Sequence, residues 1–325
     1  MRFAIIGAGV IGGTHAAAVR SLGERAELAL VVDRLPDRAR KLAAEHGAEH
    51  ADSAEAAFAR EDIDAVAVCT PSGHHADLAV AALDAGKHVV VEKPLDVSLK
   101  AAFRVAEAER RSGRTVTVIS QHRFDLASRL VRRAVEDGRF GRLTSAVASL
   151  AWWRSQGYYD SGDWRGSWAL DGGGALMNQG VHTIDLLVWM LGDPVEVYAQ
   201  TGCLAHERIE VEDTAVATVR FAGGALAVIH GTTAAYPGLT ARLQIHGDRG
   251  SAVIDDDRLA YFHSADDAAG GESPAYGAGE SANQAADLLA AHGGGAPAAP
   301  AGPRPRPASR ARAPTPTSTA TSRTP

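Results

Sequence analysis

The sequence contains little cysteine and no long hydrophobic run. Its two cysteines, Cys69 and Cys203, are too few and too far apart to predict a disulfide framework or a zinc site. No apolar run approaches the roughly 20 residues that a membrane-spanning helix needs, and no signal peptide precedes the first expected strand, which begins at Arg2. These absences predict a cytoplasmic protein without a metal site and without a membrane partner.

Acidic residues are absent from the end of the chain and frequent elsewhere. Residues 293–325 hold five arginines and eight of the 14 prolines, whereas the preceding 292 residues carry 28 Lys and Arg against 39 Asp and Glu, a net charge of −11. Such an acidic body is not expected to bind nucleic acid, although the basic tail can attract polyanions weakly. The tail composition is typical of a solvated, disordered segment.

The chain is long enough for two domains, and its hydrophobic pattern changes near residue 120. Apolar strands are expected at 3–6, 28–32, 65–69, 88–91 and 116–119, and helices at 14–22, 36–46, 77–85 and 98–112. Apolar strands that alternate with helices of this length predict a parallel sheet covered on both faces. Residues 1–121 are therefore expected to form a doubly wound α/β domain of the Rossmann type.

Beyond this point the expected strands are longer and alternate in polarity. They lie at 143–153, 195–201, 214–221, 225–231, 241–246 and 251–254, and several are joined by hairpin-type turns. One helix, expected at 175–191, interrupts them. The pattern predicts an α+β domain over 122–292 with a large, mainly antiparallel, open-faced sheet, followed by the tail at 293–325.

A glycine-rich turn follows the first strand and opens the first helix. Gly7 permits a tight turn, Gly9 lets the backbone approach a pyrophosphate, and Gly12 lets the helix pack closely on the strand. Val10 and Ile11 complete the turn, and the helix N-terminus offers free amides to phosphates. Strand, turn and helix in this order predict a dinucleotide site. A glycine turn without a ligand is the alternative.

An acidic residue closes the second strand. Asp33 lies 21 residues after Gly12, where a carboxylate can accept hydrogen bonds from the adenosine ribose hydroxyls and repel a 2′-phosphate. This position favours NAD over NADP. The alternative is that Arg34, the next residue, binds a 2′-phosphate, in which case NADP is the cofactor.

The strand at 88–91 ends in Glu92, Lys93 and Pro94. Ligands bind at the carboxyl ends of strands in doubly wound sheets, so Lys93 is expected beside the reacting carbon; a surface lysine after a strand is the alternative. Strand neighbours face opposite sides. Glu92 belongs to the segment that borders the cofactor, but its side chain is expected to turn away and pair with a structural partner. A cis bond before Pro94 would aim the lysine.

Other polar residues follow the neighbouring strand at the same edge of the sheet. Thr70, Pro71 and His75 are expected to line the cofactor site, and for His75 a plain place at the start of a helix is the alternative. Three further histidines are expected at the surface: His15, His46 and His50.

The helix expected at 175–191 follows three glycines and carries a polar stripe. Asn178, His182 and Asp185 are spaced by four and three, so they are expected to share one face of this helix. A histidine hydrogen-bonded in a core or at a domain interface is the alternative. The accompanying asparagine, aspartate and glycines favour a functional site.

These residues resemble those of the Gfo/Idh/MocA oxidoreductases, two-domain dehydrogenases of sugars and cyclitols. Besides the glycine turn, the shared motifs are Cys69–Pro71, Ala85–His88, Glu92–Pro94, Arg123–Phe124, Trp164–Arg165 and Gly172–Asp185. The resemblance covers residues 2 to about 290. It implies that Lys93 and His182 flank the substrate carbon beside the nicotinamide, and that the large sheet forms a homodimer or homotetramer interface.

The resemblance also indicates which side chains bind the small carbohydrate-type substrate. They are Arg123, Tyr159, Arg165, Asn178 and Asp185. Arg165, beside Trp164, can clamp a carboxylate or phosphate in a bidentate manner. An arginine stacked on tryptophan at an interface is the alternative.

Two positions depart from the family pattern, and a pair of tyrosines indicates a subgroup of the family. Many relatives carry Asp where this chain has Asn178, which leaves His182 without a carboxylate unless Asp185 or the substrate supplies the bond. Inositol dehydrogenases of the family carry His where this chain has Trp189, which argues against a simple inositol dehydrogenase. Tyr158 and Tyr159, ahead of Trp164 and Arg165, resemble a subgroup that includes enzymes acting on nucleotide-linked aminosugar acids.

The end of the chain also departs from the family. Relatives usually continue after a segment like 284–289 into a further helix, whereas this chain turns into Gly, Ala, Pro, Arg and Thr. This change is typical of a shifted or truncated reading frame, and loss of the helix would expose apolar surface.

The chemistry predicted from these residues is hydride transfer from a ring carbinol to C4 of NAD. His182, at an ordinary pKa of about 6.5, is expected to take the alcohol proton. The Lys93 ammonium is expected to stabilise developing alkoxide charge. Two alternatives remain: a glycosidase that retains NAD and acts by transient oxidation, and a non-catalytic NAD-binding regulator.

Overall fold

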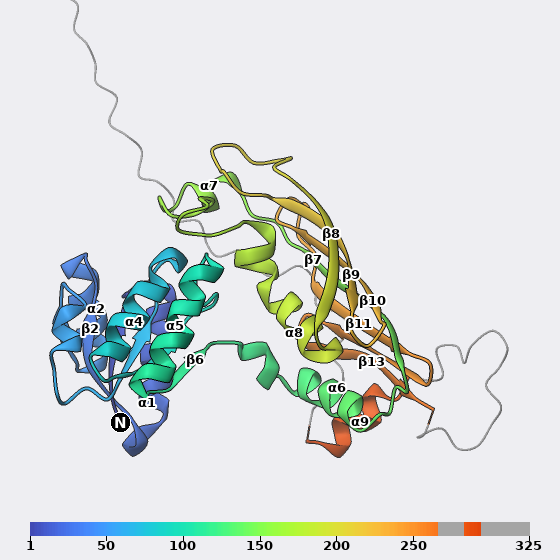
Figure 1. Cartoon of the computed structure of the whole chain (residues 1–325), viewed down its shortest axis with the longest axis horizontal. Coiled ribbons are helices and arrows are strands. Elements are labelled where there is room, and N and C mark those ends of the chain that lie inside the picture. Colours follow the sequence, from blue (N-terminus) through green and yellow to red (C-terminus); the bar gives the residue numbers. More distant parts are fainter. Residues whose placement is uncertain (266–282, 294–325) are drawn as a thin grey trace, which may run out of the picture.

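The computed structural model describes residues 1–265 and 283–293, which form two sheets with their helices (Figure 1). The first sheet has six parallel strands in the order β3-β2-β1-β4-β5-β6. The strands are β1 Arg2–Ile6, β2 Glu27–Val32, β3 Glu49–Ala51, β4 Ala65–Val68, β5 His88–Val91 and β6 Val116–Val118. The helices are α1 Val10–Ser21, α2 Pro36–His46, α3 Glu55–Phe58, α4 His75–Asp84 and α5 Leu99–Ser112. The expected doubly wound sheet is confirmed. The polar sequence of the short edge strand β3 does not predict it.

Alternate residues of the central strand β1 pack on opposite faces of this sheet. Ala4 and Ile6 belong to a buried cluster with α4 and α5, and Ile5 belongs to a second cluster with α1 and α2. Helices therefore cover both faces, which explains why the strands are apolar without interruption. The carboxyl ends of the strands, where Lys93 lies, remain at the edge between these two layers.

The second sheet has seven strands in the order β13-β12-β11-β7-β10-β9-β8, antiparallel except for the β10–β7 pair. The strands are β7 Leu143–Ala151, β8 Pro194–Gly202, β9 Thr214–Phe221, β10 Leu226–Thr232, β11 Ala241–Gly247, β12 Gly250–Asp255 and β13 Arg258–Ser264. The helices are α6 Leu126–Glu136, α7 Gln156–Tyr159, α8 Val181–Leu191 and α9 Ala285–Ala291. Apolar residues of α6 and α8 pack on one face of this sheet, and Figure 1 shows α8 on the side turned toward the first sheet. The mainly antiparallel sheet is confirmed, while α6, α7, α9 and β13 are additional to the expected elements.

The helix expected at 175–191 is divided into two parts. Residues Ala175–Gly180 form a π-helical turn, and the regular helix α8 begins only at Val181. The backbone of Glu212 and its carboxylate hold the start of this turn, because they accept the N–H groups of Ala175, Gly174 and Leu176 at 2.9, 3.0 and 2.9 Å. The expectation that Asn178 shares one regular helix face with His182 and Asp185 is therefore wrong. Turns of this kind occur frequently at functional sites.

Two further observations complete the fold. Among the described helices, none is both long and apolar enough to cross a membrane. The expected tail at 293–325, and with it the expected change of reading frame, lies outside the described residues except for Gly293.

Candidate active site

The turn between β1 and α1 has the geometry that its glycines predict. Gly7 has φ +104°, and a Cβ there would lie 2.5 Å from the Cys69 carbonyl oxygen. A Cβ at Gly12 would clash with the Gly7 carbonyl oxygen, whereas a Cβ at Gly9 would meet nothing within 4 Å. The turn itself needs Gly7 and Gly12. Gly9 leaves open space beside it, flanked by the exposed side chains of Val10 and Ile11.

Asp33 is clamped beside this turn at the end of β2. Its Oδ2 accepts the N–H of Ala8 at 2.8 Å, and its Oδ1 accepts the N–H of Leu35 at 2.9 Å. Arg34 points to solvent from the next position and is exposed. A fixed carboxylate at this place fits the ribose of a dinucleotide.

The loop after β4 carries a buried hydroxyl and a buried histidine. Thr70 Oγ1 is buried and has no hydrogen-bond partner among the described residues. His75 is 1% exposed, with Nδ1 2.7 Å from the Pro94 carbonyl oxygen and Nε2 2.9 Å from the Thr70 carbonyl oxygen. Both ring nitrogens are therefore occupied by backbone groups. His75 joins the Lys93–Pro94 segment to the Thr70–Pro71 loop, instead of offering its polar atoms to a cofactor as expected.

Lys93 follows β5 and reaches the second half of the chain. Its Nζ donates to the Asn178 carbonyl oxygen at 3.1 Å and lies 3.4 Å from Asn178 Oδ1. Burial lowers the pKa of Lys93, against the opposing effect of the charges on Glu92 and Asp171. The Lys93–Pro94 bond is cis, as expected. This contact brings the end of β5 to the π-helical turn that precedes His182.

Glu92 faces away from the Lys93 amine, as the alternation of strand residues predicts. Its Oε1 lies 2.9 Å from His15 Nε2, and its Oε2 accepts the backbone N–H of Lys93 at 3.2 Å. His15 is therefore a half-buried partner of Glu92 rather than the surface residue expected. Glu92 holds the segment in place through these contacts, and His15 is the structural partner that was expected for its side chain.

His182 lies in the first turn of α8, beside the cavity between this helix and the sheet. The cavity has a volume of about 60 Å³ and is also lined by Gln179, Trp152 and His122. Burial, together with the positive charges of Lys93 and His122, lowers the pKa of His182 to about 4. The imidazole is therefore neutral at neutral pH, and the expectation of an ordinary pKa is wrong.

His122, in the turn before α6, has the opposite character. Its ring meets the His182 ring edge-on, with 5.0 Å between centroids. Its Nδ1 lies 3.1 Å from Asp257 Oδ1 and 2.7 Å from Asp125 Oδ2, and hydrogen bonds with these two carboxylates raise the pKa of His122 to about 9. The ligand atoms of the three residues lie within 4.8 Å of one another, close enough to hold a metal ion.

A group of side chains near Lys93, called the cationic wall here, contains two arginines and three neutral residues. They are Arg154, Arg165, Tyr158, Trp164 and Gln179. Arg165 stacks between the rings of Tyr158 and Trp164, at 4.3 and 4.4 Å from their centroids, and donates to the Tyr158 hydroxyl at 2.6 Å. Arg154 lies 5.4 Å from the Tyr158 ring and donates to Gln179 Oε1 at 2.8 Å. Burial and the charge of Arg165 lower the pKa of Arg154. Among the described residues, neither arginine makes an ion pair within 4 Å.

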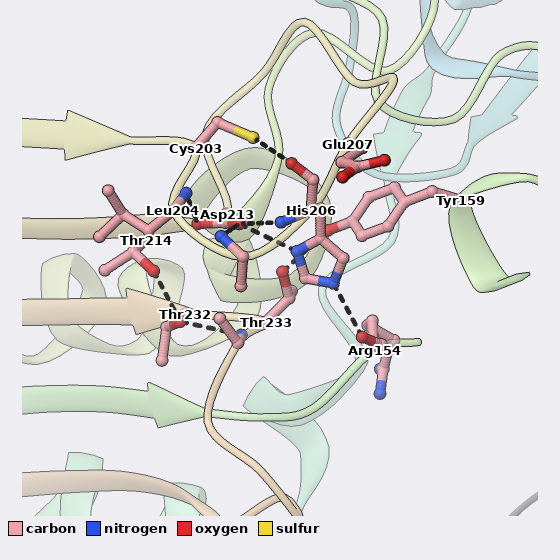
Figure 2. A network of polar contacts seen from close by, with 12 residues as sticks. Arg154, Tyr159, Cys203, Leu204, His206, Glu207, Asp213, Thr214, Thr232 and Thr233 are labelled. Carbon is pink, nitrogen blue, oxygen red and sulfur yellow. Dashed lines mark hydrogen bonds and ion pairs between the residues drawn. The ribbon is translucent and has the colours of Figure 1, made fainter. Parts of the chain in front are cut away.

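A buried network fixes the backbone of Arg154 (Figure 2). His206 Nδ1 lies 2.9 Å from Asp213 Oδ2, and His206 Nε2 lies 2.8 Å from the Arg154 carbonyl oxygen. Asp213 is fully buried and also accepts the N–H groups of Leu204 and Ala205. The loop at 203–213 and the end of β7 are therefore held together behind the cationic wall.

Comparison with known proteins identifies the family. Residues 1–120 match an oxidoreductase family with an NAD-binding Rossmann fold, and residues 128–253 match the GFO/IDH/MocA C-terminal domain. The chain belongs to the Gfo/Idh/MocA family of oxidoreductases. The open space at Gly9, the clamped Asp33 and the unpartnered hydroxyl of Thr70 fit the NAD that this family binds.

Several relatives of this Gfo/Idh/MocA oxidoreductase are dehydrogenases. Myo-inositol 2-dehydrogenase of Thermotoga maritima is 30% identical over 271 residues, 79% of this chain and 76% of the relative. Inositol 2-dehydrogenase of Rhizobium meliloti is 29% identical over 262 residues, 79% of this chain and 76% of the relative. The solved WlbA dehydrogenase from Bordetella pertussis, in complex with NADH and UDP-GlcNAcA, has a TM-score of 0.79 and 37% identity over 81% of each chain. The chain is therefore an NAD-binding oxidoreductase of the kind that acts on CH–OH groups.

Within this family site, two expected substrate ligands bind each other. Arg123 donates to both carboxylate oxygens of Asp185, at 2.8 and 2.6 Å, and its guanidinium lies 5.4 Å from the Trp189 ring. Arg132 lies against the same ring at 5.5 Å. Arg123 and Asp185, both expected to bind substrate, thus form an ion pair with each other. Asp185 consequently does not supply a hydrogen bond to His182.

Of the two adjacent tyrosines, the expected substrate ligand Tyr159 is buried away from the site. Tyr159 is 5% exposed, its hydroxyl lies 2.8 Å from Thr233 Oγ1, and burial raises its pKa to about 12. Tyr158 instead belongs to the cationic wall. Helical neighbours point about 100° apart, so only one of them can face the site, and the sequence expectation chose the wrong one.

Three residues of the site carry no clear sequence signal: Arg154, Asp171 and Gln179. Asp171 directly precedes the glycine cluster, is 1% exposed, and accepts the Asn178 Nδ2 hydrogen bond at 2.6 Å. Gln179 donates from Nε2 to the Tyr158 hydroxyl at 3.0 Å. The position of Arg154 at the end of an expected strand is the one signal that could have suggested it.

Proposed function

We propose that this oxidoreductase transfers hydride from a ring carbinol of a sugar acid, free or linked to a nucleotide, to NAD, with Lys93 and His182 on either side of the carbinol. The observation that carries the proposal is the contact of Lys93 with Asn178, four residues before His182. It joins the end of β5 to the helix that bears the histidine. A substrate bound there would meet an ammonium and a neutral imidazole together.

NAD supplies the hydride acceptor when it is bound. The His182 imidazole is neutral, so it can take the alcohol proton as the C–H electron pair leaves with the hydride. The Lys93 ammonium donates a hydrogen bond to the same oxygen and stabilises the charge that develops there. The charge of Lys93 also helps to keep the pKa of His182 low, so His182 releases the proton readily.

The cationic wall supports an acidic substrate. Arg154 and Arg165 are half-buried guanidiniums held by aromatic rings, and a planar guanidinium matches a carboxylate or phosphate in two hydrogen bonds. The WlbA dehydrogenase was solved with a uridine-diphosphate sugar acid. A neutral polyol or cyclitol would leave the Arg154 and Arg165 guanidiniums without an ion-pair partner at hydrogen-bond distance.

Asp33 supports NAD over NADP. Its clamped carboxylate can accept ribose hydroxyls and would repel a 2′-phosphate. Exposed Arg34 is the one feature of this edge that would favour NADP.

A panel of polyols, cyclitols, uronic acids and nucleotide sugar acids tests the proposal, with NAD and NADP and with NADH absorbance as the readout. Acidic sugars are expected to be oxidised with NAD. Lys93→Met and His182→Ala are expected to lower kcat/KM by about 100-fold or more. Lys100→Met and His50→Ala, the same changes at exposed positions, serve as controls.

Several results would contradict the proposal. Full turnover in both Lys93→Met and His182→Ala would show that the site is elsewhere. Hydrolysis of glycosides without net NADH would favour a glycosidase that retains NAD. NAD binding without turnover of any acidic sugar would favour a regulator.

A further inference from the structure

We propose that Asp171, acting through Asn178, is the positioning carboxylate of Lys93. Nothing in the sequence motif assigns Asp171 a role, and Asn178, the residue that contacts Lys93, is neutral. The inference rests on the proposed function, because it concerns the lysine that the proposal places at the carbinol. Asp171 itself touches neither substrate nor cofactor in this assignment.

The hydrogen bonds fix the direction of the Asn178 amide. Asn178 Nδ2 donates to Asp171 Oδ1 at 2.6 Å, so the amide oxygen turns the other way, toward Lys93 Nζ at 3.4 Å. Asp171 Oδ2 accepts the N–H of Gly166 at 2.8 Å, which fixes the carboxylate in turn. The Asp171 carboxylate therefore orients the Asn178 amide, and the oxygen of this amide faces the Lys93 ammonium.

The charges that face Lys93 show why a buried carboxylate is needed there. Burial and the Arg165 guanidinium lower the pKa of Lys93, while Glu92 and Asp171 raise it. Glu92 lies on the side of the first sheet and is already engaged by His15. His182, on α8, is neutral at neutral pH. Asp171 is therefore the carboxylate that faces Lys93 from the second half of the chain.

The state of Asp171 is consistent with this role. It is 1% exposed, and burial raises its pKa to about 6, against the lowering effects of Gly166, Arg165, Asn178 and Lys93. Above that pH it is a buried anion beside two cations. An anion held out of contact with solvent interacts strongly with a nearby buried ammonium.

The chain has four lysines, Lys41, Lys87, Lys93 and Lys100, which makes a direct test practical. In full-length protein labelled with ¹³C at lysine Cε, each side chain gives one NMR signal that reports its own titration. Lys93→Met assigns the Lys93 signal. Lys87 is buried and donates to the Arg60 carbonyl oxygen at 2.6 Å, so it serves as an internal reference for the fold.

Asp171→Asn is expected to lower the titration midpoint of Lys93 by about one pH unit and to leave that of Lys87 unchanged. The double variant Asp171→Asn/Asn178→Asp moves the carboxylate to position 178, next to Lys93, and is expected to restore the titration midpoint of Lys93. Asn178→Ala, which keeps Asp171 but removes the link, is expected to lower it. With a substrate from the panel, Asp171→Asn should reduce kcat more than it raises KM.

An unchanged Lys93 midpoint in Asp171→Asn overturns the proposal, and so does a lowered midpoint that the double variant fails to restore. If Asp171→Asn does not fold, Asn178→Ala decides, and an unchanged midpoint there overturns it. The titration needs no substrate, so its failure leaves the proposed hydride transfer intact. Failure of the substrate panel likewise leaves the titration interpretable.

Discussion

Two histidines, His122 and His182, show how neighbours set the charge of a single residue in this protein. Their ring centroids are 5.0 Å apart, yet the pKa of His122 is raised to about 9 and that of His182 is lowered to about 4. Asp257 and Asp125 stabilise the cation on His122, and this cation in turn disfavours a second charge on His182. At neutral pH the His122 ring is therefore a cation and the His182 ring is neutral.

His122→Asn is expected to destabilise the protein in a manner that depends on pH. The folded-state pKa of His122 is above its unfolded value of about 6.5, so its contribution to stability is complete below pH 6.5 and is lost as pH rises through about 9. The difference in free energy of unfolding between wild type and His122→Asn should therefore be larger at pH 6.5 than at pH 9.5. Urea unfolding at the two pH values measures it. A constant difference would contradict the prediction.

The sequence predicted single residues well where local geometry fixes them. Gly7, Gly12 and Asp33 lie at positions set by the strand and turn that carry them, and all three have the expected geometry. The sequence predicted partners poorly. Arg123 binds Asp185, which lies 62 residues later in the sequence. A local sequence pattern does not indicate which Asp or Glu side chain will pair with a given arginine.

At the scale of elements, the turn between β1 and α1 separates two uses of glycine. Gly12 is required by packing, since a Cβ there would clash with the Gly7 carbonyl oxygen. Gly9 has φ −78° and ψ −167°, which any residue adopts, and open space around it. The structure gives Gly9 no role in folding, so we expect its role to be the close approach of a ligand.

Gly9→Ala and Gly12→Ala are expected to differ accordingly. Gly12→Ala should lower Tm by about 5 °C or more, because overpacking costs about 1–3 kcal/mol. Gly9→Ala should leave Tm unchanged without ligand but remove most of the rise in Tm that NAD causes, because the methyl group occupies the pyrophosphate position. Differential scanning fluorimetry with and without NAD measures both effects. Gly223→Ala, at a turn with nothing within 4 Å, is the matched control. An undiminished NAD effect in Gly9→Ala would place the pyrophosphate elsewhere.

Elements with a strong apolar period were predictable, and those fixed by distant contacts were not. Strands β1, β2, β4, β5 and β6 and helices α1, α2, α4 and α5 follow from the sequence pattern, whereas the short elements β3 and α3 do not. The π-helical turn at Ala175–Gly180 does not, because Glu212, more than 30 residues later, holds its start. Such tertiary contacts override a helical period that continues unbroken through the sequence.

At the scale of the whole molecule, the second sheet presents an open face. Apolar side chains of β8, β9 and β10 lie in the open, with Tyr198, Val216, Leu226 and Val228 exposed by 68, 49, 58 and 45%. Tyr198 and Val228 are both paired with Thr218, so they lie in one row across three strands. The helices that pack on this sheet bury its other face. Clustered exposed apolar residues of this kind mark an association surface.

We therefore expect the protein to form a homodimer or homotetramer through this face, as the family resemblance implies. Light scattering after size exclusion should give a mass at least twice the 33.9 kDa of one chain. Val228→Glu should shift it toward the monomer, because symmetry places the new charge in the interface of every copy, where it must lose water without gaining a partner. Leu99→Glu, the same kind of change at an exposed residue of α5, should leave the mass unchanged. A monomeric wild type would contradict the expected oligomer. An oligomer that survives Val228→Glu would place the association surface on another part of the molecule.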